Sequence, residues 1–346
     1  MNFRKNIFSI FVILFACFCF MLSGFSFLKK TKIEEPVHVV SEYSTVQNQL
    51  WCVTFQLVWN ELSEKFVKGP VNFVGGNPQL ADDLNKKLYT SEILSENSYY
   101  TTFGKVSKKL KKQIEKNIKK KFNEKSDILD MINWNDKGSY LFYSILKKNF
   151  TFFVPFDRLT EASFNGSDSK VNYFGIKENT KNKVRDNVTV LFYNSPDEYA
   201  VKLNTKQNES VILYRYQTED TFENYFKYVL ANATNDKFSK KDILLIPDIN
   251  VDKTISYDEL CGRKIIGTNY LISQALQTIQ FKLDNKGGSL KSEAAISIME
   301  TALRPVEETP RYFMFDKPFV LFLIEEGKEK PYYAMKVDNI DFLVKK

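Results

Sequence analysis

The feature that most constrains the fold is a change of hydrophobic pattern near residue 139. Before it, apolar residues recur every three or four positions, as in helices. After it, short alternating or apolar runs are separated by Asn, Asp and Gly, which indicates antiparallel strands. These runs are residues 188–193, 199–203, 211–216, 242–249, 278–283, 319–324 and 332–337, with one helix expected at 221–233. Helices first and strands afterwards predict an α+β fold, in which N-terminal helices pack on large antiparallel or mixed sheets.

The N-terminal part contains three expected helices. The first covers residues 48–66 and places Leu50, Val53 and Leu57 on one face. Residues 78–89 form the second helix. Residues 105–122 form the third, in which an apolar residue recurs at every fourth position.

The third helix carries the basic excess of the chain. Residues 105–121 hold nine Lys and one Glu, a charge of +8 against +7 for the whole chain, so the remainder sums to about −1. A nucleic-acid-binding protein is not expected to have this distribution. The lysines are either a solvated helix face or a surface for a polyanion, an anionic lipid surface or an acidic partner. The residues concerned are Lys108, Lys109, Lys111, Lys112, Lys116, Lys119, Lys120 and Lys121.

The small numbers of histidine and cysteine residues limit the catalytic sites, metal sites and disulfides that the chain could form. His38 is the only histidine, so a Ser-His-Asp or Cys-His nucleophile and a zinc site are not expected. We therefore predict no enzymatic activity, no metal and no cofactor. Two of the four cysteines lie in the N-terminal apolar run, which leaves Cys52 and Cys261 for at most one disulfide.

The amino terminus indicates export. Arg4 and Lys5 precede residues 7–28, which are 22 uncharged residues. Three interpretations stay open: a single-pass anchor, a signal peptide cleaved near residues 23–26, or a lipoprotein signal at residues 14–17. Each makes the body extracytoplasmic, secreted or attached to the membrane by this segment. We expect residues 1–28 to be the signal or anchor, 29–47 a polar stalk, and 48–346 a single monomeric domain.

The segment "FMFDKPFVLFL" at residues 313–323 resembles the signature of the serpins, a family that includes inhibitors of serine proteases. The matching core is Phe315, Asp316, Lys317, Pro318 and Phe319. The closing strand also fits, although Met335 and Ile340 stand where the family usually has Gly and Pro. Residues 141–164, 242–260 and 279–297 match less specifically. The chain is thus similar to a divergent serpin over residues 130–340.

This resemblance implies an exposed reactive loop between about Gly288 and Tyr312. In inhibitory serpins, a serine or cysteine protease cleaves the loop, which then inserts as a new strand into a central sheet. The implied hinge is Gly288, Ser292, Glu293, Ala294 and Ala295. The implied cleavage site is Arg304–Pro305 or Leu303–Arg304.

Two hinge registers and two functions remain open. If Gly288 takes the place of the family's glycine, Lys291 and Glu293 face the same side and would be buried on insertion. If the run Ser292–Ser297 is the hinge, small or uncharged residues point inward instead. Residues 289–303 also have the pattern of an amphipathic helix. The protein is therefore either a protease inhibitor or a non-inhibitory surface or binding protein with the serpin fold.

Overall fold

The computed structural model describes residues 48–136, 138–290 and 310–346. The N-terminal segment, the stalk with His38, most of the expected hinge and the expected cleavage site lie outside this part. All described elements belong to one compact unit. No helix within the described ranges is long and apolar enough to cross a membrane.

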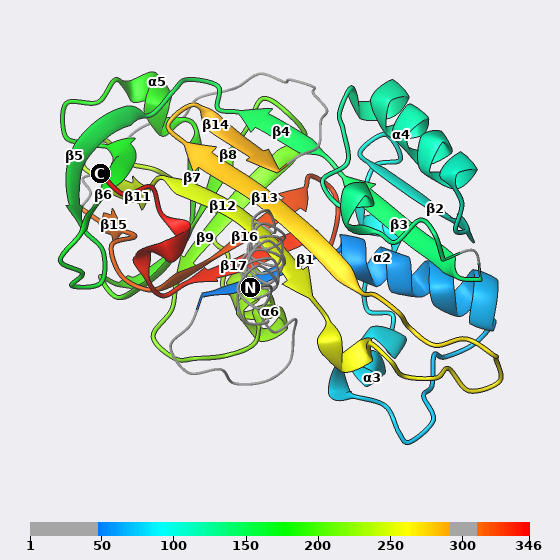
Figure 1. The fold of residues 1–346 in the computed structure, drawn as a ribbon. Coiled ribbons are helices and arrows are strands. Elements are labelled where there is room, and N and C mark those ends of the chain that lie inside the picture. The colour runs from blue at the N-terminus through cyan, green and yellow to red at the C-terminus, as the bar shows by residue number, and fades with distance from the viewer. Residues whose placement is uncertain (1–47, 137, 291–309) are drawn as a thin grey trace, which may run out of the picture. The chain divides into compact units, whose positions relative to one another are not determined.

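A seven-stranded antiparallel sheet forms the centre of this unit, in the order β1-β17-β16-β9-β8-β7-β10 (Figure 1). Every residue of β9, β16 and β17 is buried, because these strands are covered on both faces. The hairpin expected at residues 319–337 is confirmed as β16 and β17. The strands are β1 Gln49–Cys52, β7 Val188–Ser195, β8 Glu198–Asn204, β9 Glu209–Arg215, β10 Asp236–Lys237, β16 Phe319–Glu325 and β17 Tyr333–Val337.

The remaining strands form three further sheets. One of these is mixed, because β11 and β15 run parallel. This mixed sheet contains β5 Asp157–Ser163, β6 Lys170–Ile176, β11 Ile243–Pro247 and β15 Tyr312–Met314. The third sheet has the order β12-β13-β14-β4, with bounds Ile249–Ser256, Leu276–Asp284, Gly287–Leu290 and Lys148–Thr151. Strands β2 Tyr99–Lys105 and β3 Tyr140–Leu146 pair only with each other.

The helices are few, and they confirm the α+β class. They are α2 Thr54–Glu61, continued by the π-helical residues Leu62–Val67, α3 Gln79–Asn85, α4 Lys108–Phe122, α5 Asn182–Arg185 and α6 Phe222–Ala231. Short 3-10 turns lie at Ser91–Ile93, Leu129–Met131, Asp258–Leu260 and Ile340–Phe342. Helix α2 packs on one side of β3 and α4 on the other, so the β2–β3 ribbon lies between two helices (Figure 1).

Two expectations about local structure were wrong. The first expected helix begins at Thr54, not at residue 48, because residues 49–52 pair with β17 and close the edge of the seven-stranded sheet. The run 242–249 is not one strand. Strand β11 ends at Pro247, and β12 begins at Ile249 in another sheet, since proline lacks the donor that a continuing ladder needs.

Candidate functional site

The candidate site is the place where strand β14 enters the third sheet. β14 pairs antiparallel with β13 on one side and with β4 on the other (Figure 1). Leu290 lies opposite Phe281 of β13 and Lys148 of β4. The first residues of the expected loop are thus a strand, and the loop can begin only after Leu290.

Two glycines make this placement possible. Gly287 has φ +153°, and a Cβ there would lie 2.7 Å from Thr151 Cα and even closer to the carbonyl oxygen of Phe150. A Cβ on Gly288 would lie 2.8 Å from the carbonyl oxygen of Lys282. Gly288, the first residue of the expected hinge, is enclosed between two strands, because β14 passes close to both neighbours. Gly287, the first residue of β14, was not singled out in the sequence.

A cavity continues from the end of β14. Strand β3 makes no ladder with β13 in the described part of the chain, and about 220 Å³ of space lies between them above helix α2. Apolar side chains form most of the lining, among them Phe55, Phe142 and Ile279, and Leu290 lies at its border. The space has the position that one more strand, continuing β14, would occupy.

Polar groups line the same cavity at two places. The Ser144 hydroxyl is buried and has no hydrogen-bond partner among the described residues. Gln277 is satisfied: its amide donates to the carbonyl oxygen of Cys52 at 3.1 Å and to Thr54 Oγ1 at 2.7 Å. The lining can therefore accept an apolar chain that brings one hydrogen-bonding group to Ser144.

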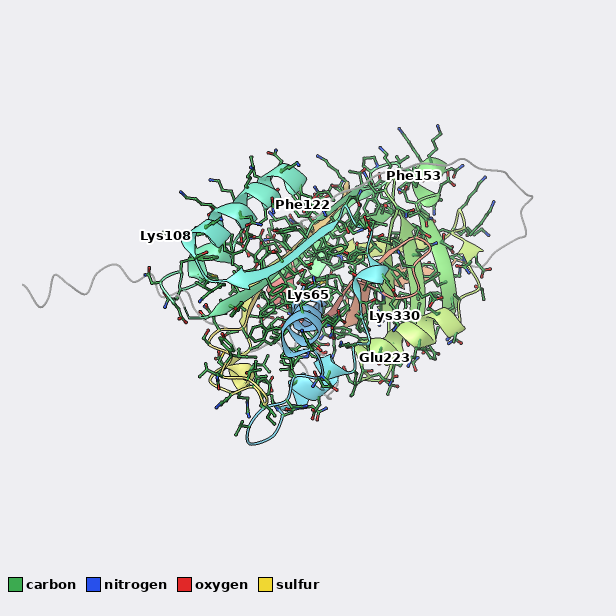
Figure 2. All side chains as sticks on the ribbon, turned by 90° about the vertical axis from the view of Figure 1, so that its right-hand side faces the viewer. Lys65, Lys108, Phe122, Phe153, Glu223 and Lys330 are labelled. Atoms are coloured by element: carbon green, nitrogen blue, oxygen red, sulfur yellow. The ribbon has the colours of Figure 1, made fainter. Side chains whose placement is uncertain are left out.

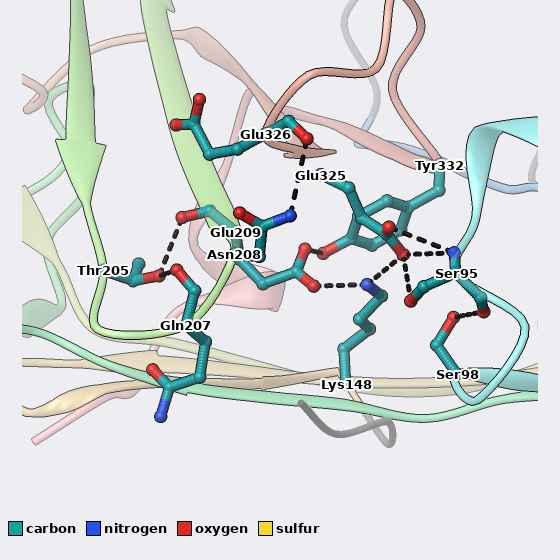
Figure 3. Close-up of polar contacts among 10 residues, drawn as sticks. All are labelled: Ser95, Ser98, Lys148, Thr205, Gln207, Asn208, Glu209, Glu325, Glu326 and Tyr332. Atoms are coloured by element: carbon teal, nitrogen blue, oxygen red, sulfur yellow. Dashed lines mark hydrogen bonds and ion pairs between the residues drawn. The ribbon is translucent and has the colours of Figure 1, made fainter. Parts of the chain in front are cut away.

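A buried ion cluster lies directly beneath β4 (Figure 3). The Lys148 ammonium contacts the carboxylates of both Glu209, at the start of β9, and Glu325, at the end of β16. Tyr332 donates to Glu209 Oε2 at 2.6 Å, and the backbone N–H of Ser95 donates to Glu325 Oε1 at 2.9 Å. The cluster connects the third sheet to the seven-stranded sheet.

Burial controls the electrostatics of this cluster. The side chains of Lys148, Glu209 and Glu325 are each no more than 4% exposed. Burial raises the pKa of Glu209 to about 7, although Lys148 and the Tyr332 hydroxyl oppose the rise. These residues were not expected from the sequence. The available signal was a charged residue inside or at the end of an apolar strand, as in "ILKKNF" and "FLIEE".

The segment that resembles the serpin signature is anchored by buried aromatic rings and by contacts of Asp316. Phe313, Phe315 and Phe319 are fully buried and pack among other aromatic rings. Asp316 lies 3.3 Å from Arg215 Nη1, and its carbonyl oxygen accepts from the Asn165 N–H.

The next two residues complete the turn. Lys317 is exposed and 3.9 Å from Asp197. Pro318 precedes the first residue of β16, where no ladder donor is needed. The segment therefore fixes the turn from β15 into β16.

The lysine-rich helix α4 presents its charge to solvent. Ser107 caps its N-terminus, and Ile114 and Ile118 are buried beside Tyr143 of β3. Lys108 projects from the start of the helix and Phe122 lies at its end (Figure 2). Two of the lysines have nearby partners, Lys111 with Asp130 at 2.6 Å and Lys121 with the carbonyl oxygen of Glu96 at 2.6 Å. Lys108, Lys109, Lys112, Lys116, Lys119 and Lys120 are exposed.

The two remaining cysteines are free thiols, so the disulfide considered from the sequence is not present. Cys52 is buried and Cys261 half-buried, and burial raises the pKa of both thiols. In the described residues, no group of three His, Cys, Asp or Glu side chains could hold a metal ion.

Similar proteins were found by comparison of structures and not by comparison of sequences. No family model matches the sequence, and no curated protein matches it either. Among solved structures, one similar chain is Serpin48, a highly specific serpin of the insect Tenebrio molitor, at 12% identity and TM-score 0.45 over 84% of this chain and 91% of that one. Human thyroxine-binding globulin in complex with its hormone has 11% identity and TM-score 0.48 over 85% and 92%. The protein is similar to serpins in its fold.

Proposed function

We propose that the protein is an exported serpin-type inhibitor of serine or cysteine proteases, with a reactive loop that inserts after cleavage. The supporting observation is β14, which is already seated between β13 and β4 with an unfilled cavity ahead of it. A loop that inserts as a strand needs such a start and such a space. Export is supported by Arg4 and Lys5 followed by an uncharged segment of 22 residues, Ile7–Leu28.

The alternation of β14 favours one of the two hinge registers. Leu290 faces the buried side together with Phe281 and Lys148, since directly paired residues share a face. If the strand continues with this alternation, Ser292, Ala294 and Ile296 turn toward the buried face of the sheet, on the same side as Leu290. Lys291 and Glu293 then point outward and keep their hydration, which avoids a cost of several kcal/mol per buried, unpaired charge. We therefore propose the register in which Ser292–Ala295 is the hinge.

The proposed bait bond lies near Arg304, outside the described residues. A cationic side chain before the bond suits a trypsin-like protease, whereas Pro305 opposes cleavage of the Arg304–Pro305 bond. Leu303–Arg304 is the other candidate bond. A non-inhibitory surface or binding protein with the same fold is the second candidate function, and the experiment below separates the two.

The test uses the full-length chain, held in mild detergent because of its apolar N-terminal segment. Incubation with a panel of serine and cysteine proteases should give a covalent complex that survives SDS, and loop cleavage should raise the melting temperature. Ala294→Asp should abolish both effects, whereas its neighbour Ala295→Asp, on the outward face, should leave them. Cleavage with neither a complex nor a rise in melting temperature would reject inhibition and favour the binding protein. Equal behaviour of the two variants would reject the register.

A further inference from the structure

The ion cluster beneath β4 contains an uncompensated charge. One ammonium, that of Lys148, contacts two carboxylates, those of Glu209 and Glu325, so the fully ionised cluster has a net charge of −1. All three side chains are enclosed. A buried net charge is unfavourable, and two carboxylates that share one cation favour uptake of a proton by the pair.

The groups around the cluster cannot supply the missing positive charge. Tyr332 and Ser95 contribute neutral donors to the two carboxylates. Outside the cluster, Glu326 accepts from Ser210 Oγ, and Lys202 lies 3.6 Å from Glu326. Among the described residues, Lys148 is the cation that contacts the two buried carboxylates, and a proton is the smallest group that could neutralise the remainder.

The position of the cluster gives the proton a structural consequence. Lys148 lies on β4, directly opposite Leu290 of β14. Glu209 and Glu325 lie at paired positions of β9 and β16. The cluster is therefore the buried ionic contact between the strand that receives β14 and the seven-stranded sheet (Figure 3).

We propose that the Lys148–Glu209–Glu325 cluster binds one proton near neutral pH and that this proton fastens β4, and with it β14, to the seven-stranded sheet. Protonation of one carboxyl removes the net charge of the cluster and the repulsion between its two carboxylates. The raised pKa of Glu209 agrees with this arrangement. The proposal concerns the stability of the seated strand and does not depend on protease inhibition.

The sign of the effect follows from linkage. The pKa of Glu209 is about 7 in the folded protein against an ordinary 4.5, so between these values the folded state binds a proton that the unfolded state lacks. The contribution of Glu209 to the free energy of unfolding is therefore greatest in acid and is lost as the pH rises through 7. From pH 5 to pH 8 this one group should increase the unfolding equilibrium constant roughly 70-fold.

The experiment measures unfolding of the full-length chain in mild detergent from pH 5 to pH 8.5, in the wild type, Glu209→Gln and the matched control Glu326→Gln. Glutamine has the shape and the neutral charge of the protonated acid, so Glu209→Gln should remove most of the 70-fold dependence. Glu326→Gln should retain it, because Glu326 is half-exposed and outside the cluster. Hydrogen exchange of residues 287–290, corrected for the intrinsic pH effect, should follow the same pattern.

A second measurement covers the case in which Glu209→Gln does not fold. In the wild type labelled with ¹³C at glutamate carboxyls, the Glu209 resonance should titrate near pH 7. Titration of every glutamate below pH 5.5 would overturn the proposal, as would a folded Glu209→Gln with the pH dependence of the wild type. If Glu209→Gln loses the pH dependence of unfolding but residues 287–290 exchange as in the wild type, the proton does not stabilise β14, and that part of the proposal is rejected.

Discussion

The substitution Gly287→Ala tests whether the pairing of β14 with β4 depends on the backbone conformation of one residue. Gly287 has φ +153°, a conformation that L-residues rarely adopt. The new Cβ would meet the backbone of Phe150 and Thr151, with Thr151 Cα at 2.7 Å. Both obstacles are main-chain atoms of β4, so no side-chain rotation can relieve the clash. We expect β14 to leave β4.

The size of the effect can be worked from what β14 buries. Leu290 is 4% exposed, and its release into water costs about 2 kcal/mol. Each ladder hydrogen bond lost adds about 1 kcal/mol, less where water replaces it. The free energy of unfolding should therefore fall by about 3 to 4 kcal/mol, or β14 should open locally at a similar cost.

The assay is urea unfolding combined with hydrogen exchange of residues 287–290, and Gly69→Ala is the matched control. A Cβ on Gly69 meets nothing within 4 Å. Gly69→Ala should thus change stability by less than about 1 kcal/mol. If Gly287→Ala unfolds at the same urea concentration as the wild type, with the same protection of residues 287–290, then the pairing of β14 does not depend on Gly287.

Three further predictions concern other parts of the molecule. Lys116→Ser with Lys120→Ser should elute from a sulfated-polysaccharide column at lower salt than the wild type, since both ammonium groups are exposed on α4; equal retention would reject the polyanion surface. Leu290→Asp should destabilise the protein by about 3 kcal/mol, measured by urea unfolding, because it buries a third carboxylate opposite Lys148, which already contacts two. Cys261 should react with a thiol reagent before Cys52, which is more deeply buried, as peptide mapping would determine.

The large elements of this fold were accessible from the sequence because their signal is local. Residues 319–324 are a long apolar run next to a charged turn, and they form β16 as predicted. The lysine-rich helix ends at Phe122 as its spacing indicated, and it begins at Lys108 because Ser107 caps it. Residues 49–52 were misassigned because Leu50, Trp51 and Cys52 fit a helix as well as a strand. Only the partner strand β17, at the far end of the chain, decides between them.

The candidate site was only partly accessible, because its defining features are tertiary. Gly288 was expected at the hinge, but the contact of Gly287 and Gly288 with β4 depends on a strand far away in sequence. The cavity beside Ser144 exists because β3 and β13 do not pair, and periodicity does not report on pairing. The sequence could thus predict that a loop follows β13, but not where its strand ends.

The buried cluster raises a different question, which is why this chain keeps charges where an apolar core would cost less. Replacing a buried ion pair by packed hydrophobic residues is often neutral or stabilising. Stability alone therefore gives no reason for Lys148 to contact Glu209 and Glu325. Directional contacts restrict register more than apolar packing does, and the Lys148 ammonium on β4 contacts carboxylates on two strands of the seven-stranded sheet. The position of β4 also sets the position of the Phe150 carbonyl oxygen, against which Gly287 must fit. The ion cluster and Gly287 therefore both contact β4.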